Sequence, residues 1–372
     1  MSMELGDGFG YGYDTLLEDL ERWGQSAYAT IDSVGASVQN RTIWQLTITN
    51  AIENDHPRRT VFIHARTHPI EVQSTWVTNE IINLLLSEGP SIQALRDSVV
   101  FYIIPMLNPD GVELGYYREN AHGIDIESNW SIPHLVEPEV AAIRLRLTEL
   151  MNSEAPIEVA LNMHSAYACK RYFVFHDSAG TSLYFTTLEK QFIESVRSYF
   201  PAGIEPWNYY VSWRYSTPTR YPESWFWMNY GEAVMALTYE DMNCDTASAF
   251  DSTARALIFG VRDFLGLSTL VNIAERDNLP TQYILEQNYP NPFNSSTVLR
   301  FSFPESIDAN IFIYDIRGRL VNVLRNGPGP AGQRQVRWDG RDTFGRELPS
   351  GVYIATLSNS KLHNNVKMVL LR

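Results

Sequence analysis

The sequence of 372 residues contains only two cysteines, Cys169 and Cys244. That count excludes a disulfide-rich scaffold, and neither cysteine belongs to a Cys-x-x-Cys metal site. No apolar run reaches the ~18 residues that a membrane-spanning helix needs. Basic residues are the minority, with 29 Lys and Arg against 43 Asp and Glu and a formal net charge of −14. An acidic chain argues against nucleic acid, and against an anionic membrane, as the main partner.

The composition is that of a folded protein. Hydrophobic residues make up 44% of the chain and charged residues 19%, which are ordinary globular values. A domain usually has ~100–200 residues, so this length favours two domains. The N-terminal segment Met1–Gly8 has neither the basic part nor the apolar part of a signal peptide. Two interpretations remain at this point: the protein stays inside the cell, or the sequence begins after an export signal.

The first 270 residues alternate short apolar runs with amphipathic segments. Near-continuous apolar strands are typical of a sheet that is covered on both faces. The pattern predicts an α/β domain over residues 1–270, with a mixed, mostly parallel sheet flanked by helices. The predicted strands are Arg59–Ala65, Ser98–Ile104, Glu158–His164 and Ala233–Tyr239, and the predicted helices are Gln73–Leu86, Glu137–Met151, Leu183–Tyr199 and Ser248–Leu265.

The pattern changes toward the C-terminus. Residues 271–287 are predicted to be a linker, and the following segment Asn288–Asn294 is too rich in proline for a helix or a central strand. Short strands then alternate with turns, which predicts a small all-β sandwich over residues 288–372. The predicted strands are Thr297–Phe303, Asn310–Asp315, Leu320–Leu324, Gln333–Trp338, Gly351–Leu357 and Val366–Leu371.

Three residues have the pattern of a metal site. His68 and Glu71 lie three apart after a predicted strand, so both can face one ion, and His164 ends another predicted strand. Two histidines and one carboxylate leave a fourth position of zinc open for water, as catalytic sites require. His-x-x-Glu alone occurs often by chance, so its weight here comes from the neighbouring motifs. His64 has Thr67 three residues later instead of a carboxylate, which favours a core role.

Seven motifs follow one another along residues 10–266: Ile31–Val38 leading to Arg41–Trp44, Arg66–Glu71, Asn108–Gly111, Arg118–Asn120, Gly123–Trp130, His164-Ser165 and Leu237–Asp241. Together they resemble the carboxypeptidase A-like zinc metallopeptidases. The resemblance implies an enzyme that releases C-terminal residues from a peptide or peptide-like substrate with one zinc ion per chain. It implies that His68, Glu71 and His164 bind the zinc. It also implies that Asp125 orients the imidazole of His68 and raises its basicity.

The same resemblance assigns the catalytic groups. Glu240 is expected to take a proton from water and to deliver it to the leaving amine. Arg118 is expected to stabilise the oxyanion of the scissile carbonyl. Tyr221 is the candidate for the family's tyrosine on a mobile loop, with Tyr215 as the alternative. The structural alternatives are a carboxylate at a strand end for Glu240 and an ion pair with Glu119 for Arg118.

The sequence departs from the family where the substrate's terminal carboxylate is held. The family has Asn-Arg after its Gly-x-Asp-x segment, and this chain has Glu127 and Ser128. We assign Glu127, Ser128 and Asn120 to substrate binding. An acid at this place would repel a carboxylate. The substrate therefore presents a cationic or neutral group to Glu127, or another cation replaces the missing one. The candidate cations are Lys170, Arg171, Arg214 and Arg220.

The cysteines follow the site residues closely. Cys169 lies five residues after His164, and Cys244 lies four after Glu240. If the two strands are neighbours, as they are in the family, the cysteines come together, and we predict a disulfide. Such a bond needs an oxidising compartment. The alternative is two buried free thiols.

Motifs also run through residues 284–372: Glu286–Asn294, Ile313–Arg319, Ala331-Gly332, Val336–Gly340, Pro349–Tyr353 and Lys367–Arg372. They resemble the C-terminal sorting domains of the type IX secretion system, which are related to the Ig-like domains of flagellar hook-capping proteins. The resemblance implies an exported protein, secreted or attached to the cell surface, whose second partner is the secretion machinery. The alternative is a carbohydrate-binding or stabilising appendage.

Three functions remain in competition. The first is a zinc carboxypeptidase. The second is a zinc amidase or endopeptidase that acts on cell-wall peptides or other N-acyl amines, which the loss of Asn-Arg favours. The third is a non-catalytic binding protein on an enzyme fold, for which a missing zinc ligand or a missing Glu240 would be expected.

Overall fold

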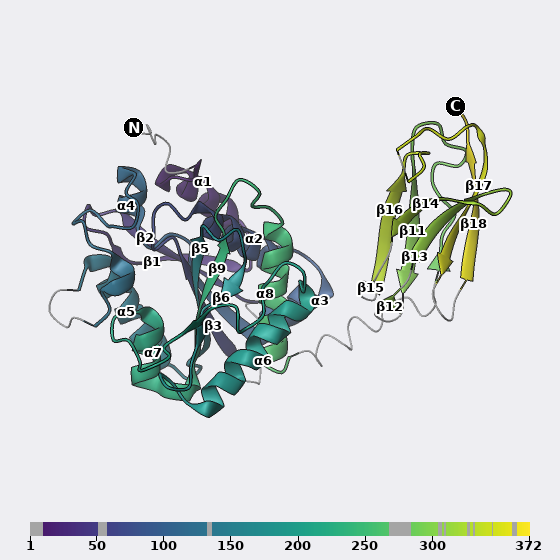
Figure 1. The fold of residues 1–372 in the computed structure, drawn as a ribbon. Coiled ribbons are helices and arrows are strands. Elements are labelled where there is room, and N and C mark those ends of the chain that lie inside the picture. The colour runs from purple at the N-terminus through teal and green to yellow at the C-terminus, as the bar shows by residue number, and fades with distance from the viewer. Residues whose placement is uncertain are drawn as a thin grey trace. The chain divides into compact units, whose positions relative to one another are not determined.

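The structure is a computed structural model that describes residues 10–50, 58–131, 136–267, 284–303, 307–308, 310–325, 328–329, 332–343, 345–358 and 363–372. The chain divides into two compact units, Met1–Asn272 and Ile273–Arg372 (Figure 1). Residues 271–283 of the predicted linker lie outside the described residues. No helix among the described residues combines the length and the apolar composition needed to cross a membrane.

The N-terminal unit is built on a seven-stranded mixed sheet in the order β1-β2-β4-β3-β5-β9-β6. The four strands β4, β3, β5 and β9 are parallel to one another, and the remaining neighbours pair antiparallel. This arrangement confirms the predicted α/β fold. The strands are β1 (Ala29–Ala36), β2 (Thr42–Ile48), β3 (Arg59–Ala65), β4 (Val99–Ile104), β5 (Ile157–Ala166), β6 (Tyr172–Phe173) and β9 (Met235–Met242); the short β7 (Phe175–His176) and β8 (Val211–Ser212) pair separately.

Helices cover both faces of this sheet (Figure 1). One core contains side chains of α1, α2, α6 and α8, and the other contains side chains of α5 and α7. Burial on both faces explains why the central parts of the parallel strands are mostly apolar. The helices are α1 (Tyr13–Trp23), α2 (Val72–Leu86), α3 (Pro90–Ser98), α4 (Pro109–Leu114), α5 (Pro138–Met151), α6 (Leu183–Tyr199), α7 (Pro222–Tyr230) and α8 (Phe250–Phe264), with the 3-10 turns η2 (Ile126–Ser128) and η3 (Gly231–Ala233).

Strand alternation places polar side chains on the α5 and α7 face near the carboxyl ends of the parallel strands. Phe62 and Ala160 belong to the core on that face, so residues two and four positions later point the same way. His164 pairs with Glu240 in the register of β5 and β9. The two side chains therefore lie next to each other at the edge where sites form in parallel sheets.

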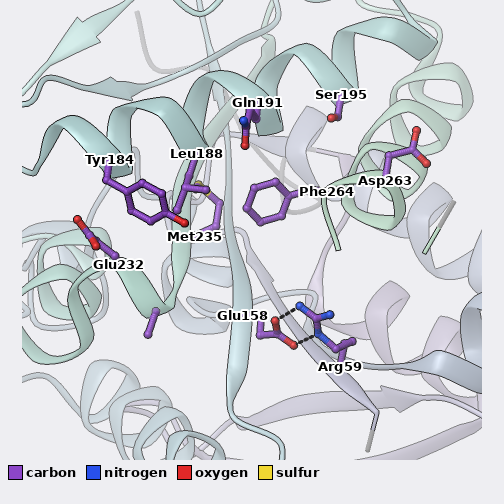
Figure 2. A pocket seen from close by; sticks show the side chains of 11 residues that line it. Arg59, Glu158, Tyr184, Leu188, Gln191, Ser195, Glu232, Met235, Asp263 and Phe264 are labelled. Atoms are coloured by element: carbon purple, nitrogen blue, oxygen red, sulfur yellow. Dashed lines mark hydrogen bonds and ion pairs between the residues drawn. The ribbon is translucent and has the colours of Figure 1, made fainter. Parts of the chain in front are cut away.

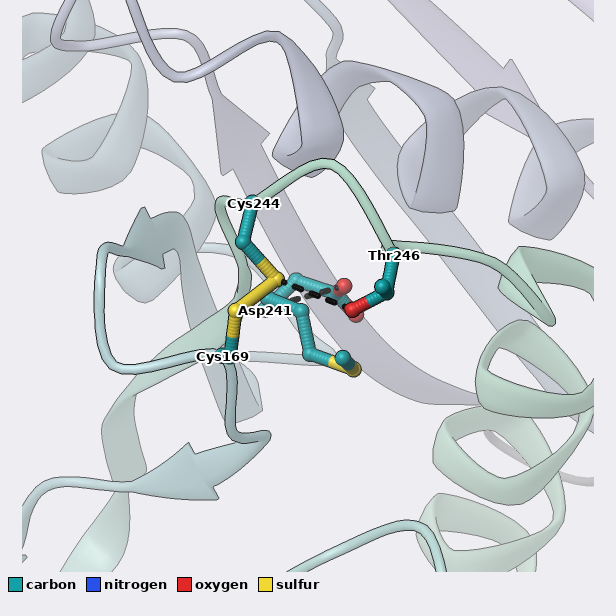
Figure 3. The surroundings of a disulfide bond; sticks show 5 residues. Cys169, Asp241, Cys244 and Thr246 are labelled. Carbon is teal, nitrogen blue, oxygen red and sulfur yellow. Dashed lines mark hydrogen bonds between the residues drawn. A yellow bond between two sulfur atoms is a disulfide. The ribbon is translucent and has the colours of Figure 1, made fainter.

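A disulfide joins Cys169 and Cys244, whose Cα atoms are 5.6 Å apart (Figure 3). Cys169 lies in the connection between β5 and β6, and Cys244 follows β9. The Sγ atom of Cys244 also lies 3.4 Å from the hydroxyl of Thr246. The bond ties together the segments that follow His164 and Glu240.

The C-terminal unit is all-β. One sheet has the order β10-β11-β16 and the other has the order β14-β13-β17-β18. A buried core that includes Phe293, Leu299, Ile311, Trp338 and Tyr353 fills the unit, which confirms the small all-β domain. The strands are β10 (Ile284–Leu285), β11 (Thr297–Phe303), β13 (Asn310–Asp315), β14 (Leu320–Arg325), β16 (Gly332–Trp338), β17 (Gly351–Ser358) and β18 (His363–Leu370), and the short β12 (Ile307–Asp308) pairs with β15 (Pro328–Gly329).

Removing the disulfide is expected to destabilise the N-terminal unit. Cys169 and Cys244 are 75 residues apart, so the bond restricts a long loop of the unfolded chain, which is worth about 2–4 kcal/mol. Chemical denaturation of the full chain with and without a reductant measures the loss. The variant with serine at both positions is the control, because a reductant should leave its midpoint unchanged. A wild-type midpoint that does not move on reduction would contradict the prediction.

Candidate metal centre

The carboxylate of Glu71 lies between two imidazole rings. Its Oε1 atom is 2.7 Å from Nδ1 of His68, and its Oε2 atom is 2.8 Å from Nδ1 of His164. All three residues are buried, and their ligand atoms lie within 4.8 Å of one another. Oε2 of Glu71 also accepts a hydrogen bond from the backbone N–H of Ser165. The structure thus brings the three predicted zinc ligands together.

A buried arginine shapes the loop that carries His68 and Glu71. Arg66 follows β3 with a φ of 57°, in the left-handed region. Its guanidinium donates to the carbonyl of Pro69 at 2.7 Å and to the hydroxyl of Thr75 at 2.9 Å. Burial lowers the pKa of Arg66 to about 9, which leaves the side chain charged at neutral pH. These hydrogen bonds fix the loop up to Glu71, the N-cap residue that precedes α2.

The opposite charges of the buried carboxylates and imidazoles stabilise one another and offset the free-energy cost of their burial. Burial raises the pKa of Glu71, but the two imidazoles outweigh burial and hold this pKa well below its usual range. Burial lowers the pKa of His164, but the charges of Glu71 and Glu127 outweigh it, and the net pKa is raised well above its usual value. The pKa of His68 is also raised, because hydrogen bonds to Asp125 and Glu71 outweigh burial.

The donor set fits zinc. Imidazole nitrogen and carboxylate oxygen are its usual ligands, and two histidines with one glutamate form a known type of catalytic site. A cluster that mixes buried carboxylates with imidazoles suits a divalent cation, since burying unpaired charge is expensive. Among the described residues, His68, Glu71 and His164 are the one group of three with this spacing.

Arg118 and Asp125 lie beside the first ligand. Asp125 places Oδ1 3.3 Å from Nε2 of His68, and its Oδ2 accepts from Nε of Arg118 at 3.1 Å. The guanidinium of Arg118 is partly exposed, and its Nη1 atom lies 4.0 Å from Oε1 of Glu71. Glu119 accepts a hydrogen bond from the backbone N–H of Arg118. The guanidinium therefore faces the metal centre rather than Glu119.

Glu240 lies next to His164 across the β5–β9 pair. Its Oε2 atom is buried and has no hydrogen-bond partner among the residues that the structure describes. Burial raises the pKa of Glu240 to about 7. A carboxylate that exchanges its proton near neutral pH and has a free oxygen at the centre has the properties of a general base and acid.

Asn120, one of the residues assigned to substrate binding, makes its hydrogen bonds within its own loop region. Asn120 is fully buried, and its side chain bonds Glu137, Glu139 and the backbone N–H groups of His122 and Ile124. It therefore shapes its own loop, and its assignment to substrate contact stays a prediction.

Glu127 is also buried, and its Oε2 atom lies 3.3 Å from Nε2 of His164. It faces a predicted zinc ligand, and its assignment to substrate contact stays a prediction. Ser128 ends the same 3-10 turn and is half-buried. A contact between Ser128 and substrate stays a prediction.

Two of the candidate replacement cations already have carboxylate partners. Arg171 is buried, and its Nε atom lies 2.9 Å from Asp241, whereas Lys170 lies 2.6 Å from Glu205. Arg214 and Arg220 are exposed.

Tyr221 immediately precedes α7 as its N-cap residue, and the guanidinium of Arg220 lies 5.2 Å from its ring centroid. The assignment of Tyr221 as the mobile-loop tyrosine stays a prediction. So does the alternative, Tyr215, which is 93% exposed.

Sequence reasoning missed a group of tyrosines around the centre. Tyr117 precedes Arg118, Tyr167 follows His164 by three residues, and their rings stack with centroids 6.5 Å apart. Both are at least half-exposed. Tyr172 on β6 pairs with Glu240 in register, and its ring contacts Tyr209 and Tyr210. Tyr117 and Tyr167 lie within three residues of Arg118 and His164 in the sequence, and this proximity could have pointed to them.

A separate hollow of about 530 Å³ lies at the opposite, amino ends of the parallel strands (Figure 2). Arg59 at the start of β3 and Glu158 at the start of β5 form an ion pair there, and Met235 at the start of β9 also lines it. Sites in parallel sheets form at the carboxyl ends of the strands. The hollow is therefore distinct from the metal centre.

Sequence comparisons agree with this geometry. The family model described as zinc carboxypeptidase matches residues 24–185, and the model described as FlgD Ig-like domain matches residues 291–362. Human cytosolic carboxypeptidase 6 is 34% identical over 148 residues, which cover 39% of this chain and 29% of that protein. Mouse cytosolic carboxypeptidase 2 is 38% identical over 109 residues, or 28% of this chain and 13% of that protein. The chain thus spans less than a third of these relatives.

Solved structures show the same fold. A metallo-carboxypeptidase from Burkholderia cenocepacia superposes with a TM-score of 0.59 at 20% identity, over 70% of each chain. Carboxypeptidase A from Helicoverpa armigera gives a TM-score of 0.53 at 16% identity, over 70% of this chain and 74% of that chain. The N-terminal unit therefore has the fold of these carboxypeptidases and matches the zinc carboxypeptidase model over residues 24–185, and the C-terminal unit is similar to the FlgD Ig-like domain over residues 291–362.

Proposed function

We propose that this protein is a zinc-dependent carboxypeptidase that hydrolyses peptide bonds and releases C-terminal residues. The observation that carries the proposal is the convergence of His68, Glu71 and His164 within 4.8 Å, beside a carboxylate with a free buried oxygen, Glu240. A non-catalytic binding protein would have no need of all four. One zinc ion per chain is the stoichiometry that this single group of ligands supports.

His68, Glu71 and His164 would hold the zinc, which when bound lowers the pKa of a water molecule and polarises a carbonyl. Glu240 accepts the proton of the attacking water and later returns it to the leaving amine. Arg118 faces the centre from the side of Asp125 and stabilises negative charge on the carbonyl oxygen. Asp125 keeps the imidazole of His68 in the orientation that turns Nδ1 toward Glu71.

One observation favours a second candidate, a zinc amidase or endopeptidase. The position where the family holds the substrate carboxylate is occupied by Glu127, and the nearby cations Arg171 and Lys170 are already paired. Product analysis on a mixed peptide library separates the two functions. Release of single C-terminal residues supports a carboxypeptidase, and internal fragments or cleaved cell-wall amides support the alternative.

Replacing Glu240 with Gln is expected to lower kcat by about 10²–10⁴-fold, because the amide cannot move the proton. Zinc content should stay at one ion per chain, since Glu240 is not among the ligands. Peptide hydrolysis and metal content measured on the same preparations check both parts. A Glu240→Gln enzyme that hydrolyses peptides at the wild-type rate would exclude Glu240 as the base.

Zinc affinity is expected to fall as the pH falls. The pKa values of both His68 and His164 are raised, so these imidazoles keep their protons to a higher pH, and zinc must displace those protons. Competition with a chelator between about pH 8 and about pH 5.5 should show affinity weakening by at least about tenfold toward acid pH. Affinity that does not depend on pH would contradict protonated imidazole ligands.

We also propose that the C-terminal unit directs export by a type IX secretion system, which places the enzyme outside the cell or on its surface. The Ig-like match over residues 291–362 and the motifs of residues 284–372 support this role. The described residues of the unit offer no group of His, Cys and acidic side chains with metal-site spacing, so a role other than catalysis suits it.

Deleting residues 288–372 tests the export role. In a bacterium with a type IX system, the full chain behind a signal peptide is expected in the medium or on the cell surface, and the truncated chain is expected to stay in the periplasm. A host in which the secretion system is inactivated is the control, since both chains should then be retained. Equal export of both chains would contradict the proposal.

A further inference from the structure

We propose that Glu127 is a positioning residue that orients His164, so that each histidine ligand is held by a carboxylate from the same short turn. The inference rests on the proposed zinc site. It assigns Glu127 to the imidazole of a ligand, in place of the substrate contact that its position in the sequence suggests.

The two histidines have matching surroundings. His68 turns Nδ1 toward Glu71 and Nε2 toward Asp125 at 3.3 Å. His164 likewise turns Nδ1 toward Glu71 and Nε2 toward Oε2 of Glu127, also at 3.3 Å. Nε2 of His164 and Oε2 of Glu127 are both buried, and neither makes a hydrogen bond to any residue that the structure describes, so their 3.3 Å separation is an ion-pair contact. At this separation, a small change in orientation would allow Nε2 of His164 to donate a hydrogen bond to Oε2 of Glu127.

One turn of the chain supplies both carboxylates. Asp125 precedes η2, and its Oδ1 atom accepts the backbone N–H of Glu127 at 3.0 Å. Ile126 lies between them and is fully buried in the core on the α5 and α7 face. This anchor fixes the turn, so that Asp125 reaches His68 while Glu127 reaches His164.

Glu127 is held from its other side by the sheet. Its Oε1 atom accepts from Nδ2 of Asn162 at 3.0 Å. Asn162 lies two residues before His164 on β5, and it also donates to Oε1 of Glu223 at 3.0 Å. The same Glu223 oxygen accepts the hydroxyl of Thr238 on β9 at 2.7 Å. The carboxylate of Glu127 is thus fixed against both strands that carry His164 and Glu240.

This arrangement has a chemical consequence. An imidazole that coordinates a metal through Nδ1 carries its proton on Nε2, and a carboxylate that accepts this proton fixes the tautomer and raises the basicity of the ligand. Glu127 can act in this way because the residue is only 7% exposed, which keeps its carboxylate inside the protein. The acid at this position thus serves the metal rather than the substrate.

The test is the zinc affinity of Glu127→Gln, measured by chelator competition at fixed pH. A glutamine must present its N–H₂ either to the imidazole N–H or to the Asn162 amide, and both are donors. We expect affinity to fall about 10–100-fold, with a shift in the visible absorption spectrum of the cobalt-substituted protein. The ratio of kcat/KM for basic and neutral substrates should stay unchanged.

Glu223→Gln is the matched control. Glu223 is equally buried and accepts from the same Asn162, but its hydrogen bonds go to Asn162 and Thr238. One amide oxygen can keep both of these hydrogen bonds. We expect its zinc affinity to stay within about twofold of wild type. A loss equal to that of Glu127→Gln would show that any change in this network weakens the site, and would overturn the specific role of Glu127.

The outcomes separate the two proposals. A wild-type protein that binds no zinc defeats the proposed function itself. Tight zinc binding that is unchanged in Glu127→Gln overturns the positioning role alone, and a change confined to KM for basic substrates returns Glu127 to substrate binding. Should the variant fail to fold, ¹⁵N-histidine spectra of zinc-loaded wild type decide: a slowly exchanging Nε2 proton on His164 supports the contact, and a rapidly exchanging one refutes it.

Discussion

The N-terminal unit is organised around one carboxylate that faces two imidazoles. Glu71 lies 2.7 Å from His68 and 2.8 Å from His164, in surroundings that exclude most solvent. Charged groups are buried only when they are paired, so the loop after β3 and the end of β5 must meet at this point. Three features hold these segments in place: the buried guanidinium of Arg66, the turn that carries Asp125 and Glu127, and the register of β5 with β9.

The excess of acid at the centre follows from the same constraint. Four carboxylates, those of Glu71, Asp125, Glu127 and Glu240, lie close to two histidines and one arginine. Such a set is poorly balanced for a site that works with imidazole alone, but it suits a divalent cation, which adds two positive charges. The metal would therefore contribute to folding as well as to chemistry, because its binding free energy stabilises the unit that positions its ligands.

Much of the fold and of the site could be predicted from the sequence. β3 has the predicted bounds, Arg59–Ala65, because a strand buried on both faces gives a nearly continuous apolar run. β1 was not predicted as a strand, since its side chains are mostly half-buried or exposed and give no such signal. His68, Glu71 and His164 were found because their motifs are local. The contact between Glu127 and His164 depends on how a turn packs against β5, and no local pattern encodes it.

The pairing of β5 with β9 limits where the chain can accept insertions and deletions. Side chains along a strand alternate between faces, so shifting a strand by one residue moves every side chain to the opposite face. Inserting one residue inside β5 would turn His164 away from Glu240, whereas insertions in the connections beyond the strands leave their partnership intact. The length of these connections is thus open to variation, while an odd-numbered insertion or deletion inside β5 or β9 is not tolerated.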